Sequence, residues 1–115
     1  MDSLNDITNQ LRDFANVRDW DQFHSPKNLV MALSGEVGEL TEHFQWLTET
    51  QSNSLDDKTL AAVSDEIADV QLYLICLADK LGIDIISESK RKILKNAEKY
   101  PVETSKGNAK KHTTY

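Results

Sequence analysis

The chain is poor in the residues that cross-link or interrupt small folds, with one cysteine, two prolines and four glycines in 115 residues. The single thiol of Cys76 excludes an intramolecular disulfide and any zinc site built from cysteines. The longest uninterrupted apolar run, residues 72–78, is far shorter than the ~20 residues that span a bilayer, which argues against a membrane protein. Residues 1–6 lack a basic and apolar leader. We therefore expect one cytoplasmic domain, large enough to bury a core without disulfides.

Charge of one sign dominates each part of the chain. The net charge of -6 argues against binding to polymeric nucleic acid, because such binding depends on neutralising phosphates. Residues 1–89 carry 5 Lys and Arg against 17 Asp and Glu, a net charge of -12, whereas residues 90–115 carry 8 against 2, a net charge of +6. Clustered carboxylates repel one another unless cations neutralise them, so a functional site is indicated if the acids of residues 1–89 converge rather than spread over the surface.

The apolar residues recur three and four positions apart, and strand-like alternation is scarce. This spacing is typical of amphipathic helices. Ser25 followed by Pro26 predicts a helix start, and Gly82 predicts a helix end. We predict an all-α fold with a four-helix bundle core, its helices covering roughly residues 3–19, 25–48, 56–81 and 84–100, with a loop at residues 50–54.

The domain boundaries follow from the same pattern. One helical domain is expected over residues 1–103, and residues 104–115 are expected to form a basic polar tail. The apolar residues 72–78 encircle the third predicted helix, so this helix needs neighbours on every side. A homo-oligomer, either a dimer or a dimer of dimers, would supply them.

Each of the two central helices carries two acids three residues apart: Glu36 and Glu39 on one, Glu66 and Asp69 on the other. Such pairs are common on solvated helix surfaces, so either pair alone means little. Their angular positions are less ordinary. At 100° per residue, the first acid of each pair lies about 60–65° from the centre of its helix's apolar stripe and the second about 120–125°, in the same rotational sense.

Equal offsets of one sense bring all four acids to the same side if the two helices are antiparallel and their apolar stripes face each other. Both pairs also lie about 15 residues, or about 22 Å, from the loop between the helices. Bringing unpaired carboxylates together at this point would destabilise the fold by roughly several kcal/mol, through mutual repulsion and lost hydration. An oxygen-only ligand set suits Mg²⁺, with Mn²⁺ as a substitute. A di-iron centre would need Glu-x-x-His on two helices, which does not occur in this sequence.

Aromatic and basic residues accompany the acids. Tyr73 and Trp46 are predicted on the acid-bearing flanks of their helices, and Trp20 follows the first helix. These rings could stack on a nucleobase or simply fill the edge of the bundle. The lysines of the fourth helix could form a solvated face or hold the outer phosphates of a metal-bound ligand; they are Lys90, Lys92, Lys95 and Lys99.

Taken together, these residues resemble the all-α nucleoside triphosphate pyrophosphohydrolases of the MazG-like group, and within it the dCTP pyrophosphatase type. The signature of that group is Glu-x-x-Glu and Glu-x-x-Asp on successive helices. The resemblance covers roughly residues 4–103, and its most similar segments are residues 18–24, 26–29, 36–40, 44–46, 66–70 and 96–101.

The resemblance implies cleavage of a nucleoside triphosphate between its α and β phosphates, giving the monophosphate and pyrophosphate, with a role in cleansing the nucleotide pool. It implies that one acid activates the attacking water, directly or through a bound metal. It also implies an oligomer whose sites are shared between subunits. The implied Mg²⁺ ligands are Glu36, Glu39, Glu66 and Asp69, the implied base pocket is Trp20, Trp46 and Tyr73, and the implied phosphate-facing residues are Lys90, Asn96 and Lys99.

One position departs from the family pattern. Leu11 stands where some dCTP-preferring relatives have a histidine, so the preferred base is left open between dCTP and a modified or non-standard nucleotide. An enzyme of the same fold that is specific for dUTP or phosphoribosyl-ATP is one alternative. The alternative from another class is a non-catalytic helical interaction module, in which the acids are solvated and the aromatic residues contact a protein partner.

Overall fold

The structure, a computed structural model, describes residues 3–109 and contains only helices, turns and loops over that range, which confirms the all-α prediction. The chain forms two compact units, residues 1–82 and residues 83–115. The elements of the first unit are α1 (Leu4–Val17), the 3-10 turn η1 (Asp21–Phe23), α2 (Pro26–Glu42), α3 (Glu49–Ser52) and α4 (Asp57–Leu81). Those of the second are α5 (Ile85–Lys99) and α6 (Val102–Ser105).

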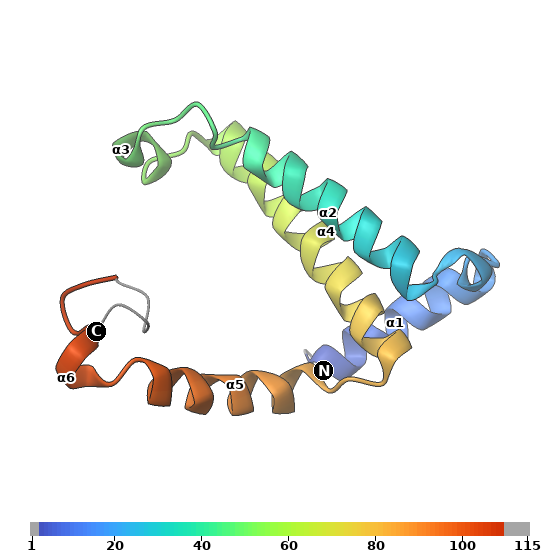
Figure 1. The fold of residues 1–115 in the computed structure, drawn as a ribbon. Coiled ribbons are helices and arrows are strands. Elements are labelled where there is room, and N and C mark those ends of the chain that lie inside the picture. The colour runs from blue at the N-terminus through green and yellow to red at the C-terminus, as the bar shows by residue number, and fades with distance from the viewer. Residues whose placement is uncertain (1–2, 110–115) are drawn as a thin grey trace. The chain divides into compact units, whose positions relative to one another are not determined.

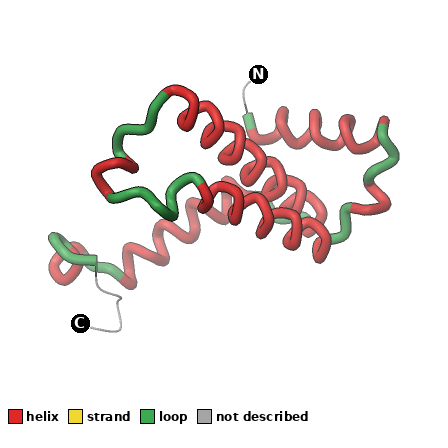
Figure 2. The backbone as a smooth tube through the Cα atoms, turned by 90° about the horizontal axis from the view of Figure 1, so that it is seen from above, coloured by secondary structure: helices red, strands yellow, loops and turns green. Residues whose placement is uncertain are grey.

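The first unit is built on the pairing of α2 with α4, which lie side by side and antiparallel in two perpendicular views (Figures 1 and 2). Leu29 of α2 and Val63 and Ile75 of α4 are almost fully buried. The helix α1 packs on α4, where the small side chains of Ala15 and Ala78 are also buried. The antiparallel arrangement is the one that the acidic pairs require if they are to meet.

Capping residues explain where the two long helices begin and end. The Ser25 hydroxyl accepts a hydrogen bond from the Asn28 amide at 3.2 Å, and Pro26 occupies the first turn of α2. The Asp56 carboxylate accepts one from the Thr59 amide at 2.7 Å and starts α4. Gly82 ends α4 with a left-handed φ of 67°, a conformation that glycine adopts without strain.

The predicted end of the second helix is wrong by about one and a half turns. The helix α2 ends at Glu42, and the stretch expected to be a loop contains the short helix α3. A capping box starts this new helix: the Thr48 hydroxyl accepts from the Gln51 amide at 3.1 Å, and the Gln51 side chain accepts from the Thr48 amide at 2.9 Å.

A short aromatic connection joins α1 to α2. It begins with a left-handed residue, Asp19, whose φ is 55°. The Trp20 amide donates to the Ala15 carbonyl at 2.9 Å, and the Trp20 ring meets the Phe14 ring edge-on at 5.6 Å between centroids. The connection is thereby attached to the end of α1, and it carries Trp20 in a fixed position there.

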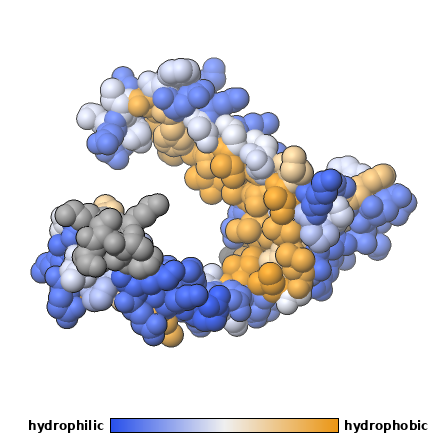
Figure 3. Space-filling view, in the orientation of Figure 1, coloured by the Kyte–Doolittle hydropathy of each residue, from blue (hydrophilic) through white to orange (hydrophobic). Residues whose placement is uncertain are grey.

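The second unit is hydrophilic along much of α5 (Figure 3). Mutual repulsion with Lys99 lowers the pKa of Lys92, so positive charge is concentrated on this helix. The helix α6 extends regular structure to Ser105, while residues 110–115 of the expected tail lie outside the described part of the chain. Within residues 3–109, no helix combines the length and apolar character needed to cross a bilayer.

Candidate functional site

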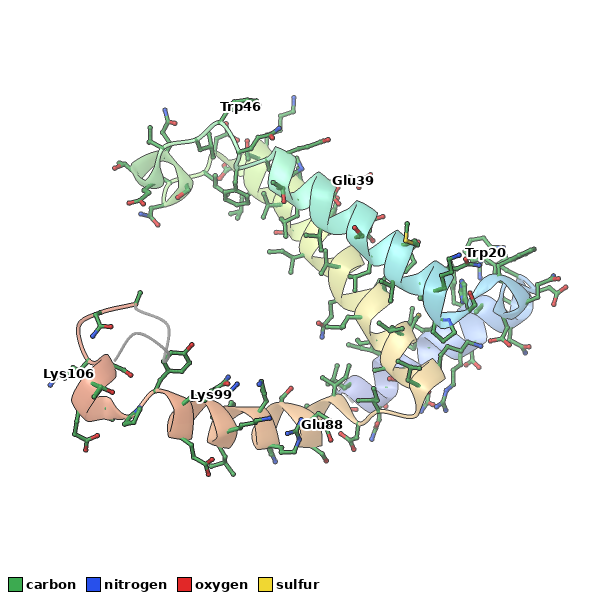
Figure 4. All side chains as sticks on the ribbon, viewed as in Figure 1. Trp20, Glu39, Trp46, Glu88, Lys99 and Lys106 are labelled. Atoms are coloured by element: carbon green, nitrogen blue, oxygen red, sulfur yellow. The ribbon has the colours of Figure 1, made fainter. Side chains whose placement is uncertain are left out.

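Three carboxyl groups from two helices meet midway along the α2–α4 pair. Glu36 and Glu39 of α2 and Glu66 of α4 each offer a carboxylate oxygen, and these oxygens all lie within 4.8 Å of one another. Glu36 and Glu66 are half-buried, whereas Glu39, labelled in Figure 4, is exposed. The acids of the two helices therefore converge at one level, as the wheel positions predict for these three residues.

The electrostatics of this acidic cluster are unfavourable without a counter-charge. The pKa of Glu36 is raised from 4.5 to about 7, mainly by desolvation and to a smaller extent by the neighbouring carboxyls. Desolvation also raises the pKa of Glu66. The charge of Asp69 contributes to both increases, so the fourth acid acts on the cluster although it is not one of the three most closely spaced groups.

Two atoms of the cluster lack any partner. The Oε2 atoms of Glu36 and Glu66 are buried and make no hydrogen bond within the described part of the chain. Ion pairs within the described part of the chain involve other acids, among them Asp79, Asp21 and Glu88. Buried carboxylate oxygens need a proton or a cation. The donor set, made only of carboxylate oxygens, fits a hard divalent ion such as Mg²⁺ or Mn²⁺.

An aromatic pocket of about 220 Å³ lies between α1, the α1–α2 connection and α4. Its volume lies below the roughly 300–1,000 Å³ of pockets that enclose drug-sized ligands. Burial raises the pKa of the Cys76 thiol, which keeps this part of the wall uncharged. Asp69 belongs both to this wall and to the surroundings of the acidic cluster. The residues that line the aromatic pocket include Leu11, Trp20, His24, Asp69, Tyr73 and Cys76.

The structure brings Trp20 and Tyr73 to one pocket but places Trp46 elsewhere. Trp46 is 85% exposed and follows the end of α2, at the opposite end of the α2–α4 pair from Trp20 (Figure 4). Its predicted position on the acid-bearing flank assumed that the helix continues to residue 48. Because α2 ends at Glu42, the helical spacing of 100° per residue does not apply to Trp46.

The remaining predicted site residues, Lys90, Asn96 and Lys99, lie on α5 and so belong to the second compact unit. Lys99 is half-buried, whereas Lys90 and Asn96 are exposed. A helix carrying this much positive charge is suited to anionic groups. Their contribution to a shared site stays a prediction.

Two pocket residues, His24 and Cys76, were not identified as site residues from the sequence. The signal for Cys76 was present, because it follows Tyr73 by three residues and Asp69 by seven, which places all three on one face of α4. His24 lies just after η1, in a segment without helical periodicity, so spacing gave no signal for it.

Comparison with known proteins adds to this geometry. The model of the MazG-like family matches residues 31–114. The chain is 42% identical to dCTP pyrophosphatase 1 of Mus musculus and 38% identical to the protein of that name from Homo sapiens, over 113 residues in each case. Each alignment covers 96% of this chain but 66% of the relative, so the chain spans just under two thirds of these curated relatives.

A solved structure matches the fold. A crystal structure of a pyrophosphatase from Archaeoglobus fulgidus superposes with a TM-score of 0.82 at 38% sequence identity. The match covers 88% of this chain and 94% of the archaeal chain.

Proposed function

Because the chain belongs to the MazG-like family, we propose that it is a nucleoside triphosphate pyrophosphohydrolase. The reaction consumes water, breaks the bond between the α and β phosphates and releases a nucleoside monophosphate and pyrophosphate. Relatives named dCTP pyrophosphatase support a role in cleansing the nucleotide pool. The observation that carries the proposal is a cluster of uncompensated carboxyls near an aromatic pocket, whose lining residue Asp69 also raises the pKa of Glu36 and Glu66 in the cluster.

The four acids are the proposed metal ligands, with Mg²⁺ as the cofactor and Mn²⁺ as its substitute. A bound divalent ion supplies positive charge that holds the phosphates and stabilises the transition state. Glu36 and Glu66 would hold such an ion through their ionised forms, so its binding would oppose the desolvation that raises their pKa values. One carboxylate of the set accepts the proton of the attacking water. The ligand set is Glu36, Glu39, Glu66 and Asp69.

The aromatic pocket is the proposed site of the base. Trp20 and Tyr73 offer ring faces for stacking, and Leu11 and Cys76 add uncharged wall. The relatives named dCTP pyrophosphatase 1 favour a pyrimidine. We therefore place deoxycytidine triphosphate, or a deoxynucleotide with a modified pyrimidine, first among the substrates. On α5, Lys90, Asn96 and Lys99 are the proposed partners of the outer phosphates.

A second copy of the chain completes the proposed enzyme. The α2–α4 pair carries a continuous apolar surface (Figure 3), in which Val37 is 44% and Ile67 is 55% exposed. These side chains border an open groove together with Leu40 and Phe44. Covering this surface in a dimer or dimer of dimers would remove it from water, and we assign Trp46 to the base pocket of a neighbouring copy in such an assembly.

The substrate is tested with a panel of the eight common nucleoside triphosphates plus oxidised and methylated analogues, each with and without Mg²⁺. We expect Mg²⁺-dependent formation of monophosphate and pyrophosphate, with a pyrimidine deoxynucleotide preferred. Chromatographic identification of the products separates this reaction from release of single phosphates. A preference for dUTP or phosphoribosyl-ATP would keep the reaction class and revise the base.

The site is tested by Glu39→Gln and Asp69→Asn, with Glu42→Gln as the matched control. Glu42 is an exposed acid of α2, three residues beyond Glu39 and outside the acidic cluster. We expect both site variants to lose pyrophosphate release at least about 100-fold while their circular dichroism stays unchanged. Full activity in both would remove the proposed site. Absence of Mg²⁺-dependent nucleotide binding by calorimetry in the unmodified protein would favour the interaction module.

A further inference from the structure

Two ion pairs join consecutive residues of α4 to the segments that face it. The Arg12 guanidinium of α1 donates to the Asp79 carboxylate twice, through Nε to Oδ2 at 2.9 Å and through Nη2 to Oδ1 at 2.5 Å. The neighbouring Lys80 ammonium donates to the Asp21 carboxylate of η1. Adjacent positions of one helix thus hold both α1 and the aromatic connection.

These pairs lie directly behind the aromatic pocket. A small cavity of about 50 Å³ is lined by all four charged residues. The same cavity and the aromatic pocket share part of their lining, namely Leu11, Ala15, His24 and Cys76. A change in the separation of the ion-paired groups is therefore transmitted to the pocket wall through residues that belong to both spaces.

The connection that carries Trp20 has little other attachment to α4. Its hydrogen bonds run to its own neighbours in the chain: Trp20 to Ala15 of α1, and Asn28 of α2 to the Phe23 carbonyl at 3.0 Å. Within residues 3–109, the Lys80–Asp21 pair is the only side-chain hydrogen bond or ion pair between η1 and α4. Asp21 directly follows Trp20, so this pair fixes the tryptophan relative to the Tyr73 side of the pocket.

We propose that the Arg12–Asp79 and Lys80–Asp21 pairs form a brace that sets the width of the base pocket, which makes Asp79 and Arg12 positioning residues for substrate binding. The inference rests on the proposed function, because the pocket is assigned to a nucleobase there. The bidentate geometry suits such a role, since two parallel charge-assisted bonds restrict both distance and orientation. The Arg12 guanidinium also holds the pKa of Asp79 below its usual range.

The brace and the acidic cluster occupy different stretches of α4, with Glu66 thirteen residues before Asp79. Loosening the brace therefore weakens binding of the base without removing a ligand of the metal. The expected kinetic signature is a higher KM with kcat little changed, which indicates a loss of uniform binding rather than of transition-state stabilisation.

The test compares Arg12→Gln, Asp79→Asn and the double variant, with Asp13→Asn as the charge-matched control on α1. We expect each single variant to raise KM for the preferred deoxynucleotide about threefold to tenfold, with kcat within about twofold. The double variant should be no worse than either single variant, since both remove the same pair. Arg12→Lys keeps the positive charge but loses the bidentate geometry of the guanidinium, and its KM should lie between those of the unmodified protein and Arg12→Gln. Asp13→Asn should leave both constants unchanged.

A second readout does not depend on turnover. In a Trp46→Phe background, Trp20 is the only tryptophan, since the chain has two. Acrylamide quenching of Trp20 in the metal-free protein should rise in Asp79→Asn and stay unchanged in Asp13→Asn, with circular dichroism verifying the fold. Should Asp79→Asn fail to fold, Arg12→Lys takes its place.

The outcomes separate the two proposals. Unchanged KM and unchanged quenching in folded Arg12 and Asp79 variants would overturn the brace while leaving the enzyme intact. Additive effects in the double variant would also overturn it, because the two residues would then act independently. No turnover of any nucleotide by the unmodified protein would defeat the proposed function, and the quenching experiment would still decide whether the brace positions Trp20.

Discussion

Two acids of the same helix, Glu66 and Asp79, show opposite solutions to the burial of charge. Glu66 is half-buried, its Oε2 atom makes no hydrogen bond within residues 3–109, and desolvation raises its pKa. Asp79 is also half-buried, but the hydrogen bonds from Arg12 lower its pKa. The carboxyl chemistry is the same, so the difference comes from the neighbours that the fold provides.

This difference separates a site that needs a ligand from a contact that is complete. At Asp79 the chain supplies its own cation, and the result is a link between helices. At the acidic cluster the chain gathers like charges, and the ion pairs formed within residues 3–82 leave these acids without a cation, which destabilises the folded state unless a proton or metal binds. Locally destabilising arrangements of this kind are expected chiefly at functional sites.

The largest effect that would sharpen this contrast is expected from Glu66→Gln. The substitution keeps the shape of the side chain but removes a proposed metal ligand, so pyrophosphate release should fall at least about 100-fold. The metal-free variant should nevertheless melt at a higher temperature than the unmodified protein, because one member of a crowded cluster has lost its charge. Calorimetry and a pyrophosphate assay on the same preparations check both halves. Lower stability together with full activity would show that Glu66 is a structural acid like Asp79.

The pH dependence of the metal-free protein follows from Glu36, whose pKa rises from 4.5 to about 7 on folding. Its contribution to stability is fully present below the unfolded pKa and is lost as the pH rises through about 7. The melting temperature should therefore fall between pH 4.5 and pH 7, and this part of the fall should be absent in Glu36→Gln. Saturating Mg²⁺ or Mn²⁺ should oppose it, because the ionised carboxylates bind the metal. A flat profile for the metal-free protein would contradict the assigned crowding.

Asp79→Asn should change the melting temperature less. The stability that Asp79 contributes should be lost as the pH falls, whereas that of Glu36 is lost as the pH rises. The pKa of Asp79 is lowered on folding, so its contribution is present above the unfolded pKa and is lost as the pH falls through the folded pKa. At neutral pH the variant should melt about 3 °C lower, the range expected for one well-formed ion pair near the surface. The difference should shrink in acid. An equal loss in Asp13→Asn would attribute the effect to net charge instead.

The smallest effect is expected in the second unit, from Glu88→Gln. The Arg91 Nε donates to the Glu88 carboxylate at 2.8 Å, but both side chains are more than half exposed. Water and salt screen such a pair, so the melting temperature should change by less than about 1 °C. A shift as large as that of Asp79→Asn would mean that solvent exposure does not distinguish the two ion pairs.

The helices and the meeting of the acids were predictable because both depend on local periodicity. Apolar spacing and the caps at Ser25, Asp84 and Gly82 gave helix boundaries close to those observed. Given an antiparallel pair, the wheel positions of Glu36 and Glu66 were enough to place them together. The capping box at Thr48 is visible in the sequence as Thr48 and Gln51, and it predicts the start of α3, although it does not predict that α2 ends at Glu42.

The aromatic pocket was harder to predict because it depends on how the irregular α1–α2 connection packs against α4. Trp46 was assigned by extending a rotation beyond the end of α2, whereas Trp20 owes its place to the turn at Asp19. The Arg12–Asp79 pair joins residues 67 positions apart and follows only from the packing of α1 on α4. Periodicity contains no information on such contacts.

The position of Asp69, which lines the aromatic pocket and acts on the acidic cluster, has a consequence for the selectivity of the proposed enzyme. One carboxyl borders the space for the base and also influences the groups that would grip the phosphates. In the proposed enzyme, a wrongly shaped base that pushes on this wall would therefore disturb the groups proposed to hold the phosphates of the same molecule. Discrimination between nucleotides should accordingly appear in the turnover rate as well as in occupancy, so that a poor substrate can bind and still be processed slowly.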